Sequence, residues 1–341
     1  MRDEKASRTR DPYWDIVRGI AILLVILGHS IFATRGARDP GHEFIYSFHM
    51  PLFMVVAGYY FRPALEKYDT WTLIRRRFIQ LILPVLVLGS VDFFFFGTIH
   101  ENLRYLPAEP LQSNLMHWYG TLIRTLWFLP ALFGCSMVAL AADRIFRGSP
   151  WFYLALIVAT MFLPDVMESK GFQAMLPCFT FGLFLRQEGW EGLYERHPAL
   201  VTALSCLLFA LLLIPFRYEM TFHECGSWLF SGDASPLTLL WFFVLRTVTG
   251  IAGSIALLCA VRTIRNQTPA AAPWRFLSHI GQHTLSLYII SYYLWIFWLN
   301  RYGTESGSWW TPLALAAGIF LLSWPLSLGT DRLKSRNRQR T

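Results

Sequence analysis

Apolar residues are grouped along the chain in long runs that charged residues or prolines separate. An α-helix needs about 20 predominantly apolar residues to cross the hydrocarbon core of a bilayer. The pattern therefore predicts an all-α, polytopic membrane protein with about ten transmembrane helices. The predicted helices cover residues 14–34, 43–61, 78–99, 118–141, 151–165, 171–185, 199–216, 237–261, 276–298 and 311–328.

The fifth and sixth runs, 151–165 and 171–185, are short. Each has about 15 residues against the roughly 20 that a span needs. The pattern leaves two alternatives open: two short spans, or one re-entrant hairpin made of both runs. Either alternative leaves the rest of the topology unchanged.

The chain is predicted to form one membrane domain, residues 14–328, between a hydrophilic N-terminal segment, residues 1–13, and a basic tail, residues 329–341. The N-terminal segment lacks the apolar stretch and small-residue cleavage site of a signal peptide, so the first helix is expected to stay in the mature protein. Any chemistry must then come from helices or short loops.

The composition is 54% hydrophobic and 15% charged, with a net charge of +8. With the N-terminus in the cytoplasm, 21 of the 30 Lys and Arg residues fall on the cytoplasmic side and 6 on the outer side. Cytoplasmic loops of membrane proteins carry such an excess. Both termini are therefore predicted to be cytoplasmic, with basic segments that contact lipid headgroups. The charge needs no nucleic-acid partner.

The cysteine and histidine patterns predict no metal site. The five cysteines form no CxxC spacing, and an odd number does not indicate a disulfide framework. His279 and His283 are four residues apart, but no acidic residue or third ligand accompanies them.

Ionisable side chains in the first predicted helix are the first candidates for chemistry, because such groups in a membrane are functional hypotheses by default. Arg18 and His29 are eleven residues apart, so they share one helix face about 16 Å apart along the axis. Asp15, three residues before Arg18, can pair with it. We expect Arg18 near the cytoplasmic end and His29 in the outer half of the membrane.

His49 lies in the first half of the second predicted helix, at roughly the depth of His29, because a short loop joins the two helices. The two histidines can therefore face one cavity. Gly28 and Gly58 remove side chains nearby, which permits close helix approach or leaves room for a substrate.

His29 has two interpretations. It is either a core histidine bonded to a neighbouring carbonyl, or a general base that takes the proton from an alcohol as the alcohol attacks an acyl group. The alignment with Arg18 and the matching depth of His49 favour the general base.

Arg75, Arg76 and Arg77, together with Arg62 and Lys67, form a basic cluster at the inner end of the second and third helices. The cluster either sets topology and contacts anionic headgroups, or captures a phosphorylated cytoplasmic donor, for which the planar guanidinium is suited.

Further candidates are weaker. Pro84, inside the third helix, can kink it. Trp127 belongs to an aromatic segment in which Pro130 breaks the fourth helix midway, and it either packs there or contacts substrate. Arg124 and Asp92 either line a polar outer cavity or pair locally. We predict Asp15, Trp127, Asp92 and Arg124 as substrate contacts.

At these positions the sequence resembles the acyltransferase 3 family of membrane-bound O-acyltransferases, especially the subgroup similar to fucose 4-O-acetylase. The resemblance runs over nearly the whole chain as an ordered set of motifs. The motifs are Asp15 with Arg18-Gly19, Arg18 paired with Gly28-His29, Phe48-His49-Met50-Pro51-Leu52-Phe53, Ala57-Gly58-Tyr59, Arg75 to Arg77 followed by Pro84, Leu126-Trp127-Phe128-Leu129, and Ile280-Gly281 with Thr284-Leu285-Ser286-Leu287-Tyr288.

The resemblance implies transfer of an acetyl or other short acyl group from acyl-CoA to a hydroxyl of a sugar or glycan, in the cytoplasmic (inner) membrane of a bacterium. It implies acyl-CoA as donor substrate and no permanently bound cofactor. Carried over, His29 is the catalytic histidine, Arg18 its motif partner and His49 the histidine of the second helix. The stretch 75–77 would contact the CoA phosphates.

Two departures from the family pattern stand out. Many relatives end the late motif with a histidine where this chain has Ser291, which leaves that position without a predicted role. The chain also has no extracytoplasmic hydrolase-like domain, so the membrane domain or partners would handle the glycan.

The main alternative is a transporter or flippase for a glycan or lipid-linked sugar, in which His29, His49 and Arg18 form a midplane substrate or proton-coupling site. Inverted repeats are frequent in transporters, and none stands out in this sequence. A non-enzymatic scaffold or sensor is a third class, which does not require aligned ionisable groups.

Overall fold

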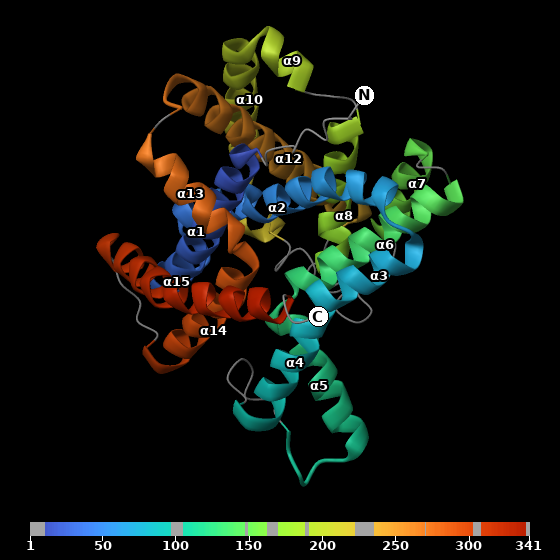
Figure 1. Cartoon of the computed structure of the whole chain (residues 1–341), viewed down its shortest axis with the longest axis vertical. Coiled ribbons are helices and arrows are strands. Elements are labelled where there is room, and N and C mark those ends of the chain that lie inside the picture. Colours follow the sequence, from blue (N-terminus) through green and yellow to red (C-terminus); the bar gives the residue numbers. More distant parts are fainter. Residues whose placement is uncertain are drawn as a thin grey trace, which may run out of the picture.

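The computed structural model describes residues 11–96, 105–146, 149–161, 170–187, 191–221, 235–269, 271–302 and 308–338, and every regular element in these ranges is helical (Figure 1). The helices of the first half are α1 (Pro12–Arg35), α2 (Pro40–Lys67), α3 (Thr70–Arg77), η1 (Phe78–Ile82), α4 (Leu83–Val91), η2 (Asp92–Phe96), α5 (Leu111–Thr125), α6 (Phe128–Phe146) and α7 (Pro150–Met161). Those of the second half are α8 (Lys170–Gln187), α9 (Glu191–Arg196), α10 (Pro198–Leu213), η5 (Tyr218–Met220), α12 (Pro236–Gln267), α13 (Ala272–Gln282), α14 (Thr284–Tyr302) and α15 (Trp310–Arg338).

Six helical segments in the described ranges are long and apolar enough to span a membrane: α1, α2, the continuous run α3–η2, α6, α12 and α15. Shorter apolar segments lie in α7, α10 and α14. The prediction of an all-helical membrane protein is confirmed. The number of ten spans, the cytoplasmic placement of both termini and the choice between spans and a hairpin for α7 and α8 stay predictions.

Aspartates and prolines set the starts of the first helices. The Asp11 carboxylate accepts a hydrogen bond from the Tyr13 amide at 2.9 Å, and Asp39 does the same for the Gly41 amide. Each cap precedes a proline at the first helical position, where the missing N–H is not needed. Gly36, with φ +86°, ends α1 in the left-handed region that favours glycine. The α1–α2 loop is therefore short, as predicted.

Two of the predicted helices are each divided into two. The break predicted at the Pro130 segment within 118–141 is present, whereas the single helix predicted over 276–298 is wrong. The first break falls at Leu126 (φ −122°, ψ 44°), between α5 and α6. Pro130 lies four residues later, and its ring would clash with the Leu126 carbonyl in a continuous helix. The second break falls at His283 (φ −107°, ψ 15°), between α13 and α14. The apolar pattern runs through the second break and conceals it.

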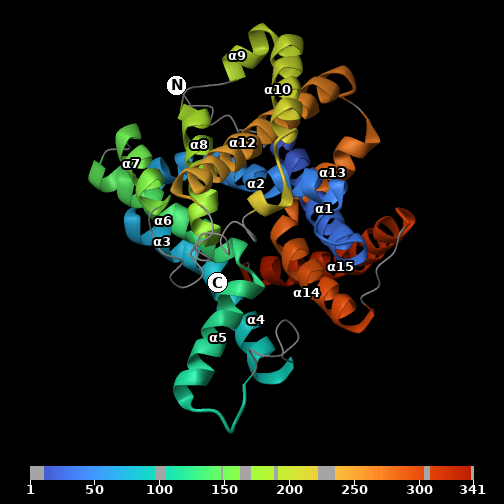
Figure 2. The ribbon, with the colours of Figure 1, turned by 180° about the vertical axis from the view of Figure 1, so that it is seen from behind.

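The third helix is continuous but widened in two places. The π-helical segments η1 and η2 flank α4. Pro84 cannot donate a backbone hydrogen bond, so the turn before it, η1, has lost the regular α-helical pattern. Pro84 therefore distorts this helix, as predicted. Figures 1 and 2 both show α4 and α5 projecting together from the main body of helices.

Paired glycines bring two helix pairs into backbone contact. A Cβ on Gly58 of α2 would overlap the carbonyl oxygen of Phe179 in α8, and a Cβ on Gly182 of α8 would overlap that of Val55. Gly19 of α1 and Gly281 of α13 have the same reciprocal relation to Leu277 and Asp15. Small residues permit such approach in membranes, where packing drives helix association. Gly28 and Gly58 therefore serve helix approach, since Gly28 faces Ile45 and Tyr46 of α2.

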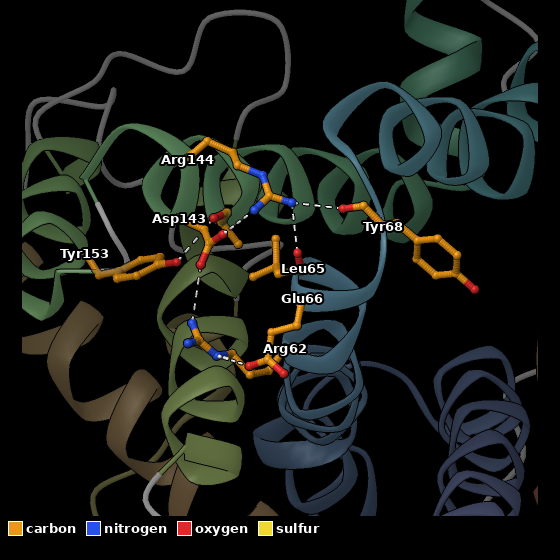
Figure 3. A network of polar contacts seen from close by, with 8 residues as sticks. Arg62, Leu65, Glu66, Tyr68, Asp143, Arg144 and Tyr153 are labelled. Carbon is orange, nitrogen blue, oxygen red and sulfur yellow. Dashed lines mark hydrogen bonds and ion pairs between the residues drawn. The ribbon is translucent and has the colours of Figure 1, made fainter. Parts of the chain in front are cut away.

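An arginine clamp joins the ends of α2 and α6 (Figure 3). Arg144 donates to the carbonyl oxygens of Leu65 at 2.8 Å and Tyr68 at 2.9 Å, at the C-terminal end of α2. Asp143 pairs with Arg144 at 3.1 Å and with Arg62 at 3.5 Å. A cation at a helix C-terminus satisfies its last carbonyls and its dipole.

Replacing Arg144 with alanine is expected to lower the free energy of unfolding by about 1–2 kcal/mol, because two carbonyls lose a charged donor that is partly exposed. The unfolding midpoint of the detergent-purified protein should fall by about 2–4 °C. Glu66→Gln is the matched control, because Glu66 is 70% exposed and its pair with Arg62 contributes little. Equal midpoints for Arg144→Ala and wild type would contradict the clamp.

Candidate functional site

A narrow cavity lies where α1, α2, α8, α12 and α14 meet. The space inside that is open to a water-sized molecule is about 40 Å³, enough for roughly three water molecules. Its polar side chains come from elements far apart in the sequence. They are His29, Tyr46, Ser47, His49, Trp127, Thr221, Arg246, Thr247, Tyr288 and Tyr292.

His29 reaches the cavity from α1 and is held on both sides. Its Nδ1 lies 3.1 Å from the hydroxyl of Tyr46, one of the α2 residues that line the cavity. The indole N–H of Trp295 donates to the His29 carbonyl oxygen at 2.8 Å, and the two rings lie 4.6 Å apart. These contacts fix the imidazole orientation. Which ring nitrogen of His29 lacks a proton depends on whether Nδ1 donates a hydrogen bond to Tyr46 or accepts one from it.

His49 faces the same cavity from α2 and is 2% exposed. Its Nδ1 lies 2.7 Å from the Ile45 carbonyl oxygen. A carbonyl oxygen only accepts, so Nδ1 carries the proton of the neutral ring and Nε2 keeps its lone pair. The two histidines therefore share one cavity, and a neutral His49 can accept a hydrogen bond there.

The predicted substrate contacts separate into two groups. Trp127 lines the cavity. It lies in the turn between α5 and α6, directly after the break at Leu126. Asp92 is buried in η2, where it interacts electrostatically with Tyr292 and Tyr293. Arg124 is exposed near the end of α5. Neither Asp92 nor Arg124 lines the cavity.

Arg18 and Asp15 lie away from the cavity, towards the N-terminus of α1. Arg18 pairs with Asp15 at 3.4 Å, and its guanidinium lies 4.9 Å from the Tyr60 ring centre. The eleven residues from Arg18 to His29 correspond to about 16 Å of helix. Arg18 therefore contacts Asp15 and Tyr60 and does not touch the imidazole.

The basic stretch on α3 lies at the same end of the helices as Arg18. Arg77 is stacked over Phe61 at 4.7 Å, one residue along α2 from the ring that Arg18 covers. Arg76 is stacked over Tyr68 at 4.2 Å, and Arg75 is exposed. Arginines stacked on aromatic rings keep their outward donors available for an anion.

Sequence reasoning assigned no role to several residues of the cavity. Arg246 is a charge inside an apolar helix, the same signal that identified His29. Tyr288 falls within the late motif, and the Ser291 hydroxyl donates back to the Tyr288 carbonyl oxygen at 3.2 Å. Thr221 and Thr247 have no sequence signal, because hydroxyl residues are common in membrane helices and loops.

The hydroxyls of Thr221 and Thr247 are buried and have no hydrogen-bond partner within the part of the chain that the structure describes. Buried polar groups are normally bonded, so exceptions need an explanation. Both threonines line the cavity, so water or a ligand inside it can supply the missing partners.

His279 and His283 lie outside the cavity. Their rings are 5.1 Å apart, and both pack edge-on against Trp324. In the described ranges, no three His, Cys, Asp or Glu side chains are grouped as metal ligands.

The fold and the cavity define a helical membrane protein that carries two histidines in a narrow internal site. Residues 11–328 match the family described as acyltransferase domain, and the chain belongs to this family. The family prediction is thereby confirmed.

Among curated proteins, the chain is similar to the nodulation protein NolL of Mesorhizobium japonicum. The two are 25% identical over 297 residues, which cover 83% of this chain and 76% of that protein. NolL of Sinorhizobium fredii is 25% identical over 219 residues, 60% of this chain and 58% of that protein. No solved structure matches the chain.

Proposed function

We propose that this protein is a membrane-bound O-acyltransferase that moves an acetyl or other short acyl group from acyl-CoA to a hydroxyl of a sugar or cell-surface glycan. The observation that carries the proposal is the convergence of His29 and His49 on one cavity, in a chain of the acyltransferase family. Its place is the bacterial cytoplasmic membrane, with the donor inside and the acceptor outside.

His29 is the general base in this mechanism. With Nδ1–H donating to the Tyr46 oxygen, Nε2 takes the proton from the acceptor hydroxyl as its oxygen attacks the thioester carbonyl. His49, whose Nε2 accepts, orients that hydroxyl or assists the proton transfer. The thioester carbon–sulfur bond then breaks, and the thiolate leaves as CoA once it regains a proton.

The size of the cavity supports a short acyl group. A space of about 40 Å³ accommodates an acetyl group but not a long acyl chain. Side chains from α1, α2, α8, α12 and α14 line it, together with Trp127 from the turn between α5 and α6. A longer chain would require these helices to move apart.

The donor phosphates are proposed to lie at the other end of the helices, on Arg75, Arg76 and Arg77. Arg18 lies at the same end of the helices as this cluster, on the ring next to the one that Arg77 covers, and we propose that it supports the donor arm. An extended acyl-CoA would then lie along the helix face that carries Arg18 and His29.

Arg76→Gln is expected to raise the KM for acetyl-CoA about fivefold, which corresponds to the roughly 1 kcal/mol of an exposed ionic contact, with kcat unchanged. The effect should shrink as salt is raised, because salt screens exposed charges. Arg275→Gln, an exposed arginine on α13, is the control and should match wild type. An unchanged KM for Arg76→Gln at low salt would remove Arg76 from the donor site.

The proposed function is tested with the purified full-length protein in lipid nanodiscs, radiolabelled acetyl-CoA and a membrane glycan fraction. Label should move to the glycan in proportion to enzyme. If an acceptor-rich fraction stays unlabelled while a known acetyltransferase labels its own acceptor, acyl transfer is wrong. The transporter reading of the two histidines is then preferred.

A further inference from the structure

Arg246 projects from α12 towards the wall of α2 that carries His49. α12 packs directly on α2, where Gly250 faces Pro51 and the Ser47 carbonyl oxygen. Arg246 is four residues before Gly250, so helical periodicity places both on one face of α12. The Arg246 guanidinium also lies 5.4 Å from the Phe243 ring centre. The packing of α12 on α2 thus places the Arg246 guanidinium at the cavity.

Arg246 lines the cavity together with Thr247, Thr221 and both histidines. Thr221 is 2% exposed and directly follows η5. The Tyr218 amide, at the start of η5, donates to the Glu43 carboxylate of α2 at 2.9 Å, and this bond holds the segment that carries Thr221 against α2. One wall therefore presents a guanidinium and two hydroxyls whose oxygens have no partner in the described chain. Donors grouped in this way match an oxygen that becomes negatively charged.

We propose that Arg246, assisted by the Thr247 hydroxyl, binds the oxygen of the donor carbonyl and stabilises the oxyanion that forms on it. This inference rests on the proposed function and deepens it. As the acceptor oxygen bonds to the carbonyl carbon, the C=O electron pair moves onto the oxygen that Arg246 faces. When the carbonyl re-forms, the carbon–sulfur bond breaks and CoA leaves with its electron pair, while the acceptor proton passes through His29 to the thiolate.

The energetics of membranes support this role. An arginine within a membrane helix carries an insertion cost of about 2.5–3.5 kcal/mol, so it is retained where it acts. A guanidinium keeps its charge at every accessible pH and offers several fixed N–H donors, which lysine does not. In a narrow cavity that has room for only a few water molecules, such a donor is effective against a developing charge.

The experiment compares Arg246→Gln, Arg246→Lys and Thr247→Val with wild type in the nanodisc assay, with kcat and both KM values measured. We expect kcat to fall about 10²–10³-fold for Arg246→Gln. Arg246→Lys should lose at least about tenfold and Thr247→Val about tenfold, with the KM for acetyl-CoA within about threefold of wild type. Arg275→Gln is the matched control for the loss of one arginine.

The outcomes separate this inference from the proposed function. If His29→Ala is inactive while Arg246→Gln keeps kcat within threefold, the oxyanion role is wrong and the acyltransferase stands. A rise confined to the acceptor KM would make Arg246 an acceptor-binding residue and would also overturn the inference. If wild type transfers no label, the proposed function fails first. Should Arg246→Gln yield no folded protein, Arg246→Lys decides, and an unchanged kcat would contradict the proposal.

Discussion

His29→Ala is expected to reduce acyl transfer by about 10²–10⁴-fold, the contribution of a positioned general base. The variant should still fold, because His29 is only half-buried and its backbone carbonyl keeps the hydrogen bond from Trp295. The measurement is label transfer from radiolabelled acetyl-CoA at matched protein amounts, with size-exclusion chromatography to verify the fold.

Two further variants sharpen this prediction. His29→Gln keeps a polar side chain beside Tyr46 but has no basic nitrogen, so it should be as inactive as His29→Ala. His279→Ala, which removes a histidine outside the cavity, should retain full transfer. Transfer by His29→Gln within tenfold of wild type would show that the imidazole is not the base.

Gly182→Ala is expected to destabilise the protein by about 3 kcal/mol, the upper end for overpacking of a core. The added methyl group would overlap the Val55 carbonyl oxygen, and backbone cannot rotate away as a side chain can. Helices α2 and α8 would have to separate, and α2 carries His49. Folded, monodisperse protein and acyl transfer should therefore fall together.

Gly318→Ala provides the control for Gly182→Ala, because a Cβ on Gly318 of α15 meets no atom within 4 Å. This variant should be as stable as wild type or slightly more stable, since alanine favours helix. If both variants unfold at the wild-type midpoint, backbone contact between α2 and α8 does not hold these helices together.

The helical membrane fold could be predicted because apolar runs of spanning length have few other interpretations. The break at His283 could not, because the apolar pattern continues through it. Pro130 marked the break in the fourth helix, but a proline does not show which way the next helix runs. Only the packing of α6 shows that the chain uses the break to place Trp127 in the cavity.

The site was predictable where a residue was out of place in its surroundings. His29 and His49 stand out from apolar neighbours, and both reach the cavity. Thr221 and Thr247 are ordinary in their sequence context, and only the contacts of η5 and α12 with α2 bring them to the histidines. Asp92 and Arg124 carry the same polar signal as His29, but neither lines the cavity, because the sequence pattern predicts the depth of a side chain and not the direction in which it points.

The small volume of the cavity has a consequence for the fate of an activated acyl group. Water is present at far higher concentration than any acceptor, so an open site would release the acyl group by hydrolysis. A space of about 40 Å³ holds roughly three water molecules, so an acetyl group and the acceptor hydroxyl together leave little room for water next to His29. The partition between transfer and hydrolysis would then depend on which hydroxyl can enter the cavity. Widening the cavity at Trp127 should admit more water and make the protein hydrolyse the thioester, as a thioesterase does.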